Sequence, residues 1–185
     1  MDFSNVKKIT ISAGEVKQIE INGVVVWRGG YTNLVPSSIN ADGSVYNGTG
    51  YKDDYRIRSG GAEAESSNAA CTGFIKVNAG DAVRFSGIPW FESGDAGSSD
   101  ALNVADASFT NLGQFTMLQN AMYGIFTQAA YKDYAAASVV EEKTGVWKWI
   151  VPAGAGIAYV RITAFDNEGE KTGKDMIVTV NEEIE

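Results

Sequence analysis

Short apolar runs alternate with turn residues over the first 30 residues of this chain. β-branched and other apolar side chains concentrate in residues 6–11, 16–21 and 24–27, separated by Ser12-Ala13-Gly14 and by Asn22-Gly23. Asn-Gly supports the positive φ values of a two-residue type I′ turn, so the last two runs predict a hairpin. The pattern as a whole predicts a small three-stranded β-meander over residues 1–30.

The register of this hairpin predicts two apolar faces. The pairs expected opposite each other are Ile21 with Val24 and Ile19 with Val26. The alternate positions, which include Val25 and Trp27, form a second face that is also partly apolar. Because such a hairpin is not stable alone in water, we expect it to dock on the main domain, a second copy or a neighbouring protein. Val25 and Trp27 are the candidate interface residues.

From residue 31 onward, β-type runs alternate with turns rich in Gly, Asn and Asp. Residues 72–77 and 82–85 flank one such turn, residues 146–151 and 157–165 flank another, and each pair predicts an antiparallel hairpin. In the run 157–165, apolar residues alternate with Tyr159, Arg161 and Thr163, which predicts a sheet packed on one side, with Arg161 as a solvated or sheet-spanning charge. Residues 176–180 predict a closing strand.

The number and spacing of these strands predict an all-β chain, in which a jelly-roll-like antiparallel β-sandwich occupies residues 31–185. Residues 98–142 give a mixed signal. We expect a strand at 102–105 and a turn at 106–111, whereas residues 114–123 and 135–142 are compatible with a helical turn or a strand, because alanine and methionine favour helix.

Composition narrows the function classes. The chain has 185 residues, a formal net charge of −8 and a pI near 4.6, which argue against a nucleic-acid footprint. No run of 18 apolar residues predicts a membrane-spanning helix, and the N-terminal residues lack the pattern of a signal peptide. The single cysteine, Cys71, cannot form an internal disulfide, and its sequence context predicts a small buried residue.

The side chains present argue against most catalytic chemistry. The chain has no histidine, which excludes Ser-His-Asp and Cys-His nucleophiles and histidine-ligated zinc. Glycoside hydrolysis stays open, since it needs only two carboxylates roughly 5–10 Å apart. The acidic candidates lie among turn residues, where Asp commonly accepts local hydrogen bonds. They are Asp53, Asp54, Glu92, Asp95, Asp100 and Asp106. No cofactor is expected. The acidic loop 166–170 or another loop could bind a structural Ca²⁺, but the sequence does not place such a site.

Aromatic residues near acidic turns are candidates for binding a sugar. Trp90 precedes an acidic, Gly-rich loop, and Tyr51 and Tyr55 frame Asp53 and Asp54. Flat rings stack on the apolar faces of sugars while carboxylates hydrogen-bond to hydroxyl groups. These five residues are therefore the candidate ligand-binding residues, with core packing as the alternative for each ring. For Trp147 and Trp149, two residues apart on one strand, core packing is the expectation.

Several of these segments resemble known proteins. Residues 6–9, 15–19 and 21–27 resemble the short repeats at the start of minor tail proteins from phages and prophages of Gram-positive gut bacteria. The body resembles the jelly-roll, galactose-binding-like modules found beside them. The matching segments are residues 32–36, 50–51, 55–56, 72–84, 158–162 and 176–184. The resemblance implies attachment to a cell-surface glycan or to a neighbouring tail protein, and it implies no catalytic residue.

We therefore expect a non-enzymatic structural or adhesive protein of a phage or prophage tail, located in the virion and able to form a homo-oligomer. The alternative is a free carbohydrate-binding module or a bacterial surface adhesin, which would be extracellular or on the cell surface. A glycosidase or lyase that relies on carboxylates alone is the third class.

Overall fold

The computed structural model describes residues 18–21, 24–28, 31–87, 101–118, 121–126, 140–165 and 173–184. Within these ranges the chain is all-β, which confirms the predicted fold class. Helical geometry is limited to three single turns, namely η1 (Val35–Ser37), η2 (Tyr46–Gly48) and η4 (Gly173–Asp175). In this part of the chain, no helix is long and apolar enough to cross a bilayer.

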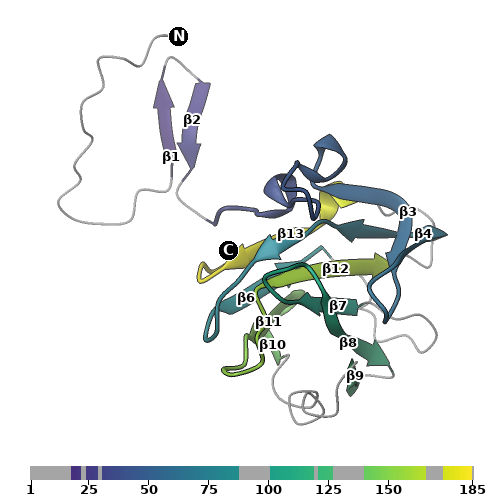
Figure 1. Ribbon diagram of the computed structural model, residues 1–185. Helices are drawn as coiled ribbons and strands as arrows, with labels where there is room; N and C mark the ends of the chain where they lie inside the picture. The colour runs from purple at the N-terminus through teal and green to yellow at the C-terminus, as the bar shows by residue number, and fades with distance from the viewer. Residues whose placement is uncertain are drawn as a thin grey trace.

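Two antiparallel sheets form the body of the molecule (Figure 1). The smaller sheet has the strand order β10 (Val140–Lys143), β11 (Val146–Ile150), β6 (Ala82–Ser86) and β13 (Ile177–Val180). The larger has the order β3 (Tyr51–Ile57), β4 (Glu63–Thr72), β12 (Tyr159–Phe165), β7 (Ala101–Ala105), β8 (Asn111–Leu118) and β9 (Ala121–Phe126). The short strand β5 (Ile75–Lys76) also pairs with β12.

The hydrophobic core draws on both sheets, as in a β-sandwich. Phe85 and Trp149 contribute from the smaller sheet and Leu102 and Ile162 from the larger, each at most 1% exposed. Trp147 packs against this cluster from a partly buried position, so both tryptophans of β11 serve the core as predicted. The side chains that alternate with the core residues face away from it, because successive side chains of a strand point to opposite faces.

Both hairpins predicted for the body are wrong. Strand β6 pairs with β11 and β13, whereas the segment before it pairs with β12, so residues 72–77 and 82–85 belong to different sheets. Likewise β11 and β12 lie in different sheets, although only a short turn separates them. The two connections hydrogen-bond to each other instead, with Gly80 N donating to the Val151 carbonyl and Val77 N to the Ala158 carbonyl. Turn residues thus mark two sheet-to-sheet crossings.

The segment that sequence left open between helix and strand is strand where described. Residues 101–105 form β7, as expected, and the following turn is closed by Asp106, whose side chain accepts hydrogen bonds from Ser108 N and Thr110 N. Residues 111–118 and 121–126 then form a hairpin of β8 and β9, and β10 begins at Val140. Pairing with neighbouring strands overrides the local helix preference of Ala and Met here.

The N-terminal hairpin forms a two-stranded sheet of β1 (Gln18–Ile21) and β2 (Val24–Arg28), and its first pair, Ile21 with Val24, is the predicted one. The register then shifts, so that Ile19 stands opposite Trp27 and not opposite Val26 as predicted. A β-bulge, which places two residues of one strand opposite one of the other, accounts for this shift. The predicted strand at 6–11 lies outside the described residues, so the division into a meander and a sandwich stays a prediction.

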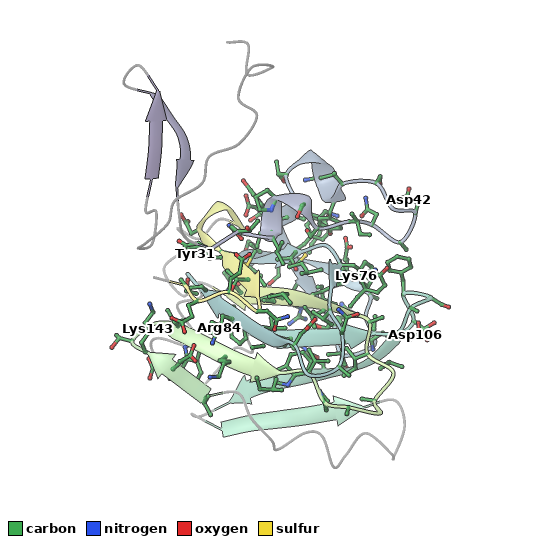
Figure 2. The ribbon with its side chains drawn as sticks, turned by 90° about the vertical axis from the view of Figure 1, so that its left-hand side faces the viewer. Tyr31, Asp42, Lys76, Arg84, Asp106 and Lys143 are labelled. Carbon is green, nitrogen blue, oxygen red and sulfur yellow. The ribbon has the colours of Figure 1, made fainter. Side chains whose placement is uncertain are left out.

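Each sheet carries a buried arginine on the face turned away from the core. On the smaller sheet, Arg84 of β6, labelled in Figure 2, is 9% exposed. It forms a bidentate pair with Glu142 of β10 at 2.5 and 3.1 Å. Lys148 contacts the same carboxylate. Hydrogen bonds from Arg84 and Lys148 lower the pKa of Glu142 to about 2. This cluster ties the edge strand β10 to the centre of its sheet.

Candidate functional site

The curled hairpin of β3 and β4 carries four of the five predicted ligand-binding residues. Pairing runs regularly from Tyr51 with Thr72 to Asp53 with Ala70, and then jumps to Tyr55 with Glu65. Asp54 thus stands opposite four residues of β4, and its φ is +61°. An irregularity of this kind bends a strand pair sharply. The hairpin therefore curls here, which Figure 1 shows as the strong curve of β3.

Beyond the bend, the tip of the hairpin covers the outer face of the larger sheet. Ile57 N donates to Thr163 Oγ1 at 3.0 Å, Asn103 Nδ2 donates to the Arg58 carbonyl at 3.0 Å, and Asn111 Nδ2 donates to the Ser59 carbonyl at 2.8 Å. These bonds join the tip to β12, β7 and β8. A face that alternation predicted to be open to solvent is thereby buried.

Because the hairpin tip covers this face, the side chain of Arg161 is buried. Of the two predicted alternatives, a solvated charge is wrong because Arg161 is only 6% exposed, whereas a charge that spans the sheet agrees with its contacts to β4. Its Nη2 lies 2.8 Å from Glu63 Oε1, its Nε donates to the Thr72 carbonyl at 3.2 Å, and its guanidinium carbon lies 4.7 Å from the centroid of the Phe74 ring. Buried charges are stable only when paired and hydrogen-bonded, and the folded-back hairpin supplies that partner as Glu63.

The groups around Arg161 titrate outside their usual ranges. Burial acts to raise the pKa of Glu63, but hydrogen bonds from Arg161 and Tyr46 and the charge of Arg161 together hold it below its usual value. Cys71 lies in the same layer, with Sγ 3.8 Å from the hydroxyl oxygen of Tyr46, and is fully buried. Burial raises the pKa of its thiol to about 11. The prediction that Cys71 is a small buried residue is confirmed.

Tyr51 and Asp53 have a structural role, because both contact Gly173 in the turn η4. The ring of Tyr51 packs against the core and lies so close to Gly173 that a Cβ there would be 2.3 Å from Tyr51 Cδ2. Asp53 Oδ1 accepts a hydrogen bond from Gly173 N at 2.6 Å. Both side chains therefore hold the turn η4 on strand β3. For Tyr51 this is the packing alternative that the sequence left open.

Tyr55 and Asp54 line an open hollow at the bend of the hairpin, with a volume of about 720 Å³. Its other lining residues come from the opposite strand: Glu65, Ser66, Ser67 and Asn68. Tyr55 is partly buried, and Lys52 Nζ lies 3.2 Å from the centroid of its ring. The Tyr55 hydroxyl donates to Glu65 Oε1 at 3.4 Å. The hollow thus combines one aromatic ring with carboxylates, hydroxyls and an amide.

The hollow unites residues that the sequence suggested with residues that it did not. Tyr55 and Asp54 were predicted, whereas the facing residues 65–68 were missed. Their signal is the run Glu65-Ser66-Ser67-Asn68, which interrupts the alternation expected within a long strand. Four consecutive polar residues there indicate a local bulge, but only the tertiary structure places them opposite Tyr55.

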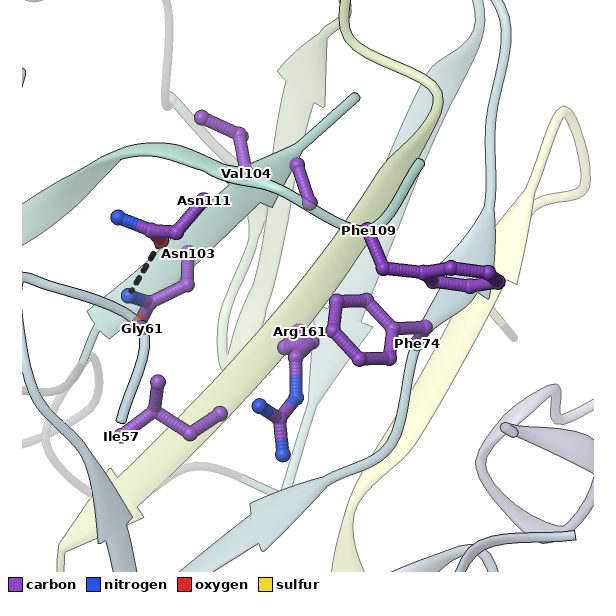
Figure 3. Close-up of a pocket in the computed structure, with 9 residues that line it drawn as sticks. Ile57, Gly61, Phe74, Asn103, Val104, Phe109, Asn111 and Arg161 are labelled. Carbon is purple, nitrogen blue, oxygen red and sulfur yellow. Dashed lines mark hydrogen bonds between the residues drawn. The ribbon is translucent and has the colours of Figure 1, made fainter. Parts of the chain in front are cut away.

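A smaller cavity lies beneath the tip of the same hairpin (Figure 3). It encloses about 30 Å³ between the hairpin and the outer face of the larger sheet. Its walls are Ile57, Gly61, Phe74, Asn103, Val104, Ala105, Phe109, Asn111 and Arg161. Phe109 stacks on Tyr159 with ring centroids 4.5 Å apart and meets Phe74 edge-on at 5.0 Å.

The remaining predicted residues are not placed. Trp90 and the acidic loop 166–170 lie outside the described residues, and the hairpin that carries Val25 and Trp27 is described by its backbone only. Among the described residues, no group of three or more His, Cys, Asp or Glu side chains is placed to hold a metal ion. No known protein family, curated protein or solved structure matches this chain.

Proposed function

We propose that this protein is a non-enzymatic binding module, whose hollow at the bend of β3 and β4 takes a neutral glycan. The observation that carries the proposal is the convergence of the Tyr55 ring with Asp54, Glu65, Ser66 and Asn68 around one depression. Its volume of about 720 Å³ falls in the range of small-molecule sites, roughly 300–1,000 Å³. A sugar offers an apolar face to the ring and hydroxyls to the surrounding acceptors.

The charges of the hollow disfavour an anionic ligand. Asp54 and Glu65 bring two carboxylates to the hollow, and the whole chain has a formal net charge of −8. These two carboxylates and the negative net charge repel phosphorylated or uronic-acid polymers. Lys52 stands over one face of the Tyr55 ring, so a sugar would stack on the other. Neutral hexose or N-acetylhexosamine residues satisfy both conditions.

The setting we propose follows the resemblance of the N-terminal and body segments to phage and prophage tail proteins. In that setting the protein is a structural or adhesive component of the virion, and it binds a cell-surface glycan or a neighbouring tail protein. The N-terminal hairpin attaches it to the tail or to other copies through Val25 and Trp27. A free carbohydrate-binding module or bacterial surface adhesin would use the same hollow without a virion role.

A glycan array followed by calorimetry with the best neutral glycan tests the binding site. Tyr55→Ala removes the ring, and we expect about tenfold weaker binding, the equivalent of about 1.4 kcal/mol for one lost stacking contact. Tyr31→Ala is the matched control, because Tyr31 is also a partly buried tyrosine but lies outside the hollow. Equal effects of the two substitutions, or no signal from any neutral glycan, would contradict the proposal.

Light scattering tests the attachment role of the hairpin separately. Trp27→Glu places a charge in the proposed interface, and we expect the mass of any oligomer to fall to that of the monomer. A variant that keeps the fold, the solubility and the oligomeric state of the parent would count against the role of Trp27.

A further inference from the structure

The cavity beneath the hairpin tip contains a buried acceptor without a donor. Asn103 is 2% exposed, and its Oδ1 has no hydrogen-bond partner among the described residues. The orientation of this amide is fixed, because its nitrogen faces the Arg58 carbonyl, which can only accept. Asn111 does not supply the missing donor, because it turns its Oδ1 toward Asn103 Nδ2, and its own Nδ2 donates to the Ser59 carbonyl. A buried acceptor left in this state destabilises the fold unless an occupant donates to it.

The charges around the cavity favour a neutral occupant. Arg161 is the one charged residue among its lining residues, and that guanidinium is paired with Glu63 and hydrogen-bonded to the Thr72 carbonyl. The positive charge of Arg161 is therefore already compensated by Glu63, so it offers little attraction to an anionic ligand. A cationic ligand would be repelled by Arg161, and the residues that line the cavity include no carboxylate to bind it.

The size and walls of the cavity define the occupant further. A free volume of about 30 Å³ holds roughly two water-sized groups, too little for a sugar ring. Beside the Asn103 oxygen, the walls include the apolar side chains of Ile57, Phe74 and Phe109. One hydroxyl and one adjoining CH₂ match this combination of a single acceptor with apolar surroundings.

The aromatic wall is held in place by the turn that follows β7. Phe109 has a φ of +63°, which is rare for a bulky side chain. Its N–H donates to the Asp106 carbonyl at 3.0 Å, and the Asp106 side chain accepts from the following residue, so the turn keeps this conformation. The ring is thereby fixed between Phe74 and Tyr159 at the edge of the cavity.

We propose that this cavity is a second binding site, distinct from the hollow at Tyr55, and that it takes a primary alcohol group whose hydroxyl donates to Asn103 Oδ1. The CH₂ of the alcohol packs against Phe74 and Phe109. Two sources offer this group: the hydroxymethyl arm of a hexose, and a free polyol. The site adds selectivity for ligands that carry such an arm.

Amide NMR spectra of the full chain test the proposal with matched sugars. Methyl glucoside carries the hydroxymethyl group, methyl xyloside lacks it, and methyl 6-deoxyglucoside keeps the carbon but lacks the hydroxyl. We expect methyl glucoside to shift the side-chain amide signals of Asn103 and Asn111, and the two analogues to bind at least tenfold more weakly there. Glycerol tests the polyol source, and binding of glycerol as tight as that of methyl glucoside would assign the site to polyols.

Variants distinguish loss of binding in this cavity from a folding defect and from loss of binding in the hollow. Ala105→Val fills the cavity without touching its hydrogen bonds and should abolish the shifts, whereas Ala153→Val, at an exposed loop position, should not. Tyr55→Ala should leave the Asn103 signals responsive, so failure of the hollow and failure of the cavity are told apart. Equal shifts with all three glycosides, or no shift with any sugar or with glycerol, would overturn the inference and leave the cavity to water.

Discussion

The pairing of Arg161 with Glu63 supports a sharp prediction about stability. In this pair the guanidinium side chain is 7% exposed and the carboxylate side chain 30% exposed. Glu63→Gln keeps the size of the side chain and one hydrogen-bond acceptor but removes the charge. It therefore leaves a buried cation without a counter-charge, whereas the hydrogen bond to the Thr72 carbonyl stays in place.

The size of the effect follows from these exposures. Removing one partner of a fully buried ion pair costs about 3–5 kcal/mol. Because Glu63 is partly exposed and glutamine retains a neutral hydrogen bond, we expect a smaller loss of about 2–3 kcal/mol. At roughly 2–4 °C per kcal/mol for a protein of this size, Tm falls by about 4–12 °C. Thermal and urea unfolding followed by circular dichroism measure both quantities.

Lys52→Gln is the matched control, because Lys52 contacts the same carboxylate at 3.3 Å with both side chains 30% exposed. Exposed pairs contribute at most about 1 kcal/mol, so this variant should unfold close to the parent. If both variants lose the same stability, or if Glu63→Gln unfolds like the parent, the reasoning about the buried guanidinium is refuted.

The same pair also has a pH signature. The pKa of Glu63 is lowered in the folded state from the usual 4.5, so its ionised form stabilises the fold above that pH. This contribution is lost as the pH falls from about 4.5 through the lower folded-state pKa. The difference in stability between the parent and Glu63→Gln should therefore be full at neutral pH and shrink in acid.

Three further predictions concern other parts of the sandwich. Gly50→Ala should cost about 3 kcal/mol or more in urea unfolding, because φ is +81° and a Cβ would lie 1.7 Å from the Val35 carbonyl oxygen, whereas Gly43→Ala, with a φ of +83° and open space, should cost only about 1–2 kcal/mol. A thiol reagent at pH 8 should leave Cys71 unmodified in the folded protein and label it in urea, since the thiol is buried with a pKa of about 11; fast labelling of the native state would contradict its burial. Because the pKa of Glu142 is lowered to about 2, its stabilising contribution should be lost between about pH 4.5 and 2; an acid transition unchanged in Glu142→Gln would refute this.

Local sequence patterns were sufficient for the positions of most elements. Short β-type runs identified β6, β11, β12 and β13, and in β12 an alternation with a period of two also showed which residues share a face, because side chains of a strand point alternately to its two faces. The short apolar run before Asp106 and the turn at that residue were also predicted correctly. The burial of Cys71 followed from its small apolar surroundings in the sequence.

Tertiary structure alone decided which strands pair. Residues 78–81 and 152–156 contain ordinary turn residues, and the same residues serve a hairpin or a crossing between sheets. The choice depends on partners far along the chain, such as β13 for β6. Pairing is therefore a non-local property, which periodicity within one strand does not encode.

The two proposed binding sites show the same division between what the sequence determines and what the tertiary structure determines. Sequence pointed to Tyr55 and Asp54 through their chemistry, but their partners on β4 face them because the hairpin bends at Asp54. Arg161 is buried because a hairpin about 100 residues earlier folds over its face and brings Glu63 to it. The residues thus determined which chemistry is available, and the folding back of one hairpin determined which groups meet, since burial and pairing of a polar face depend on what covers it.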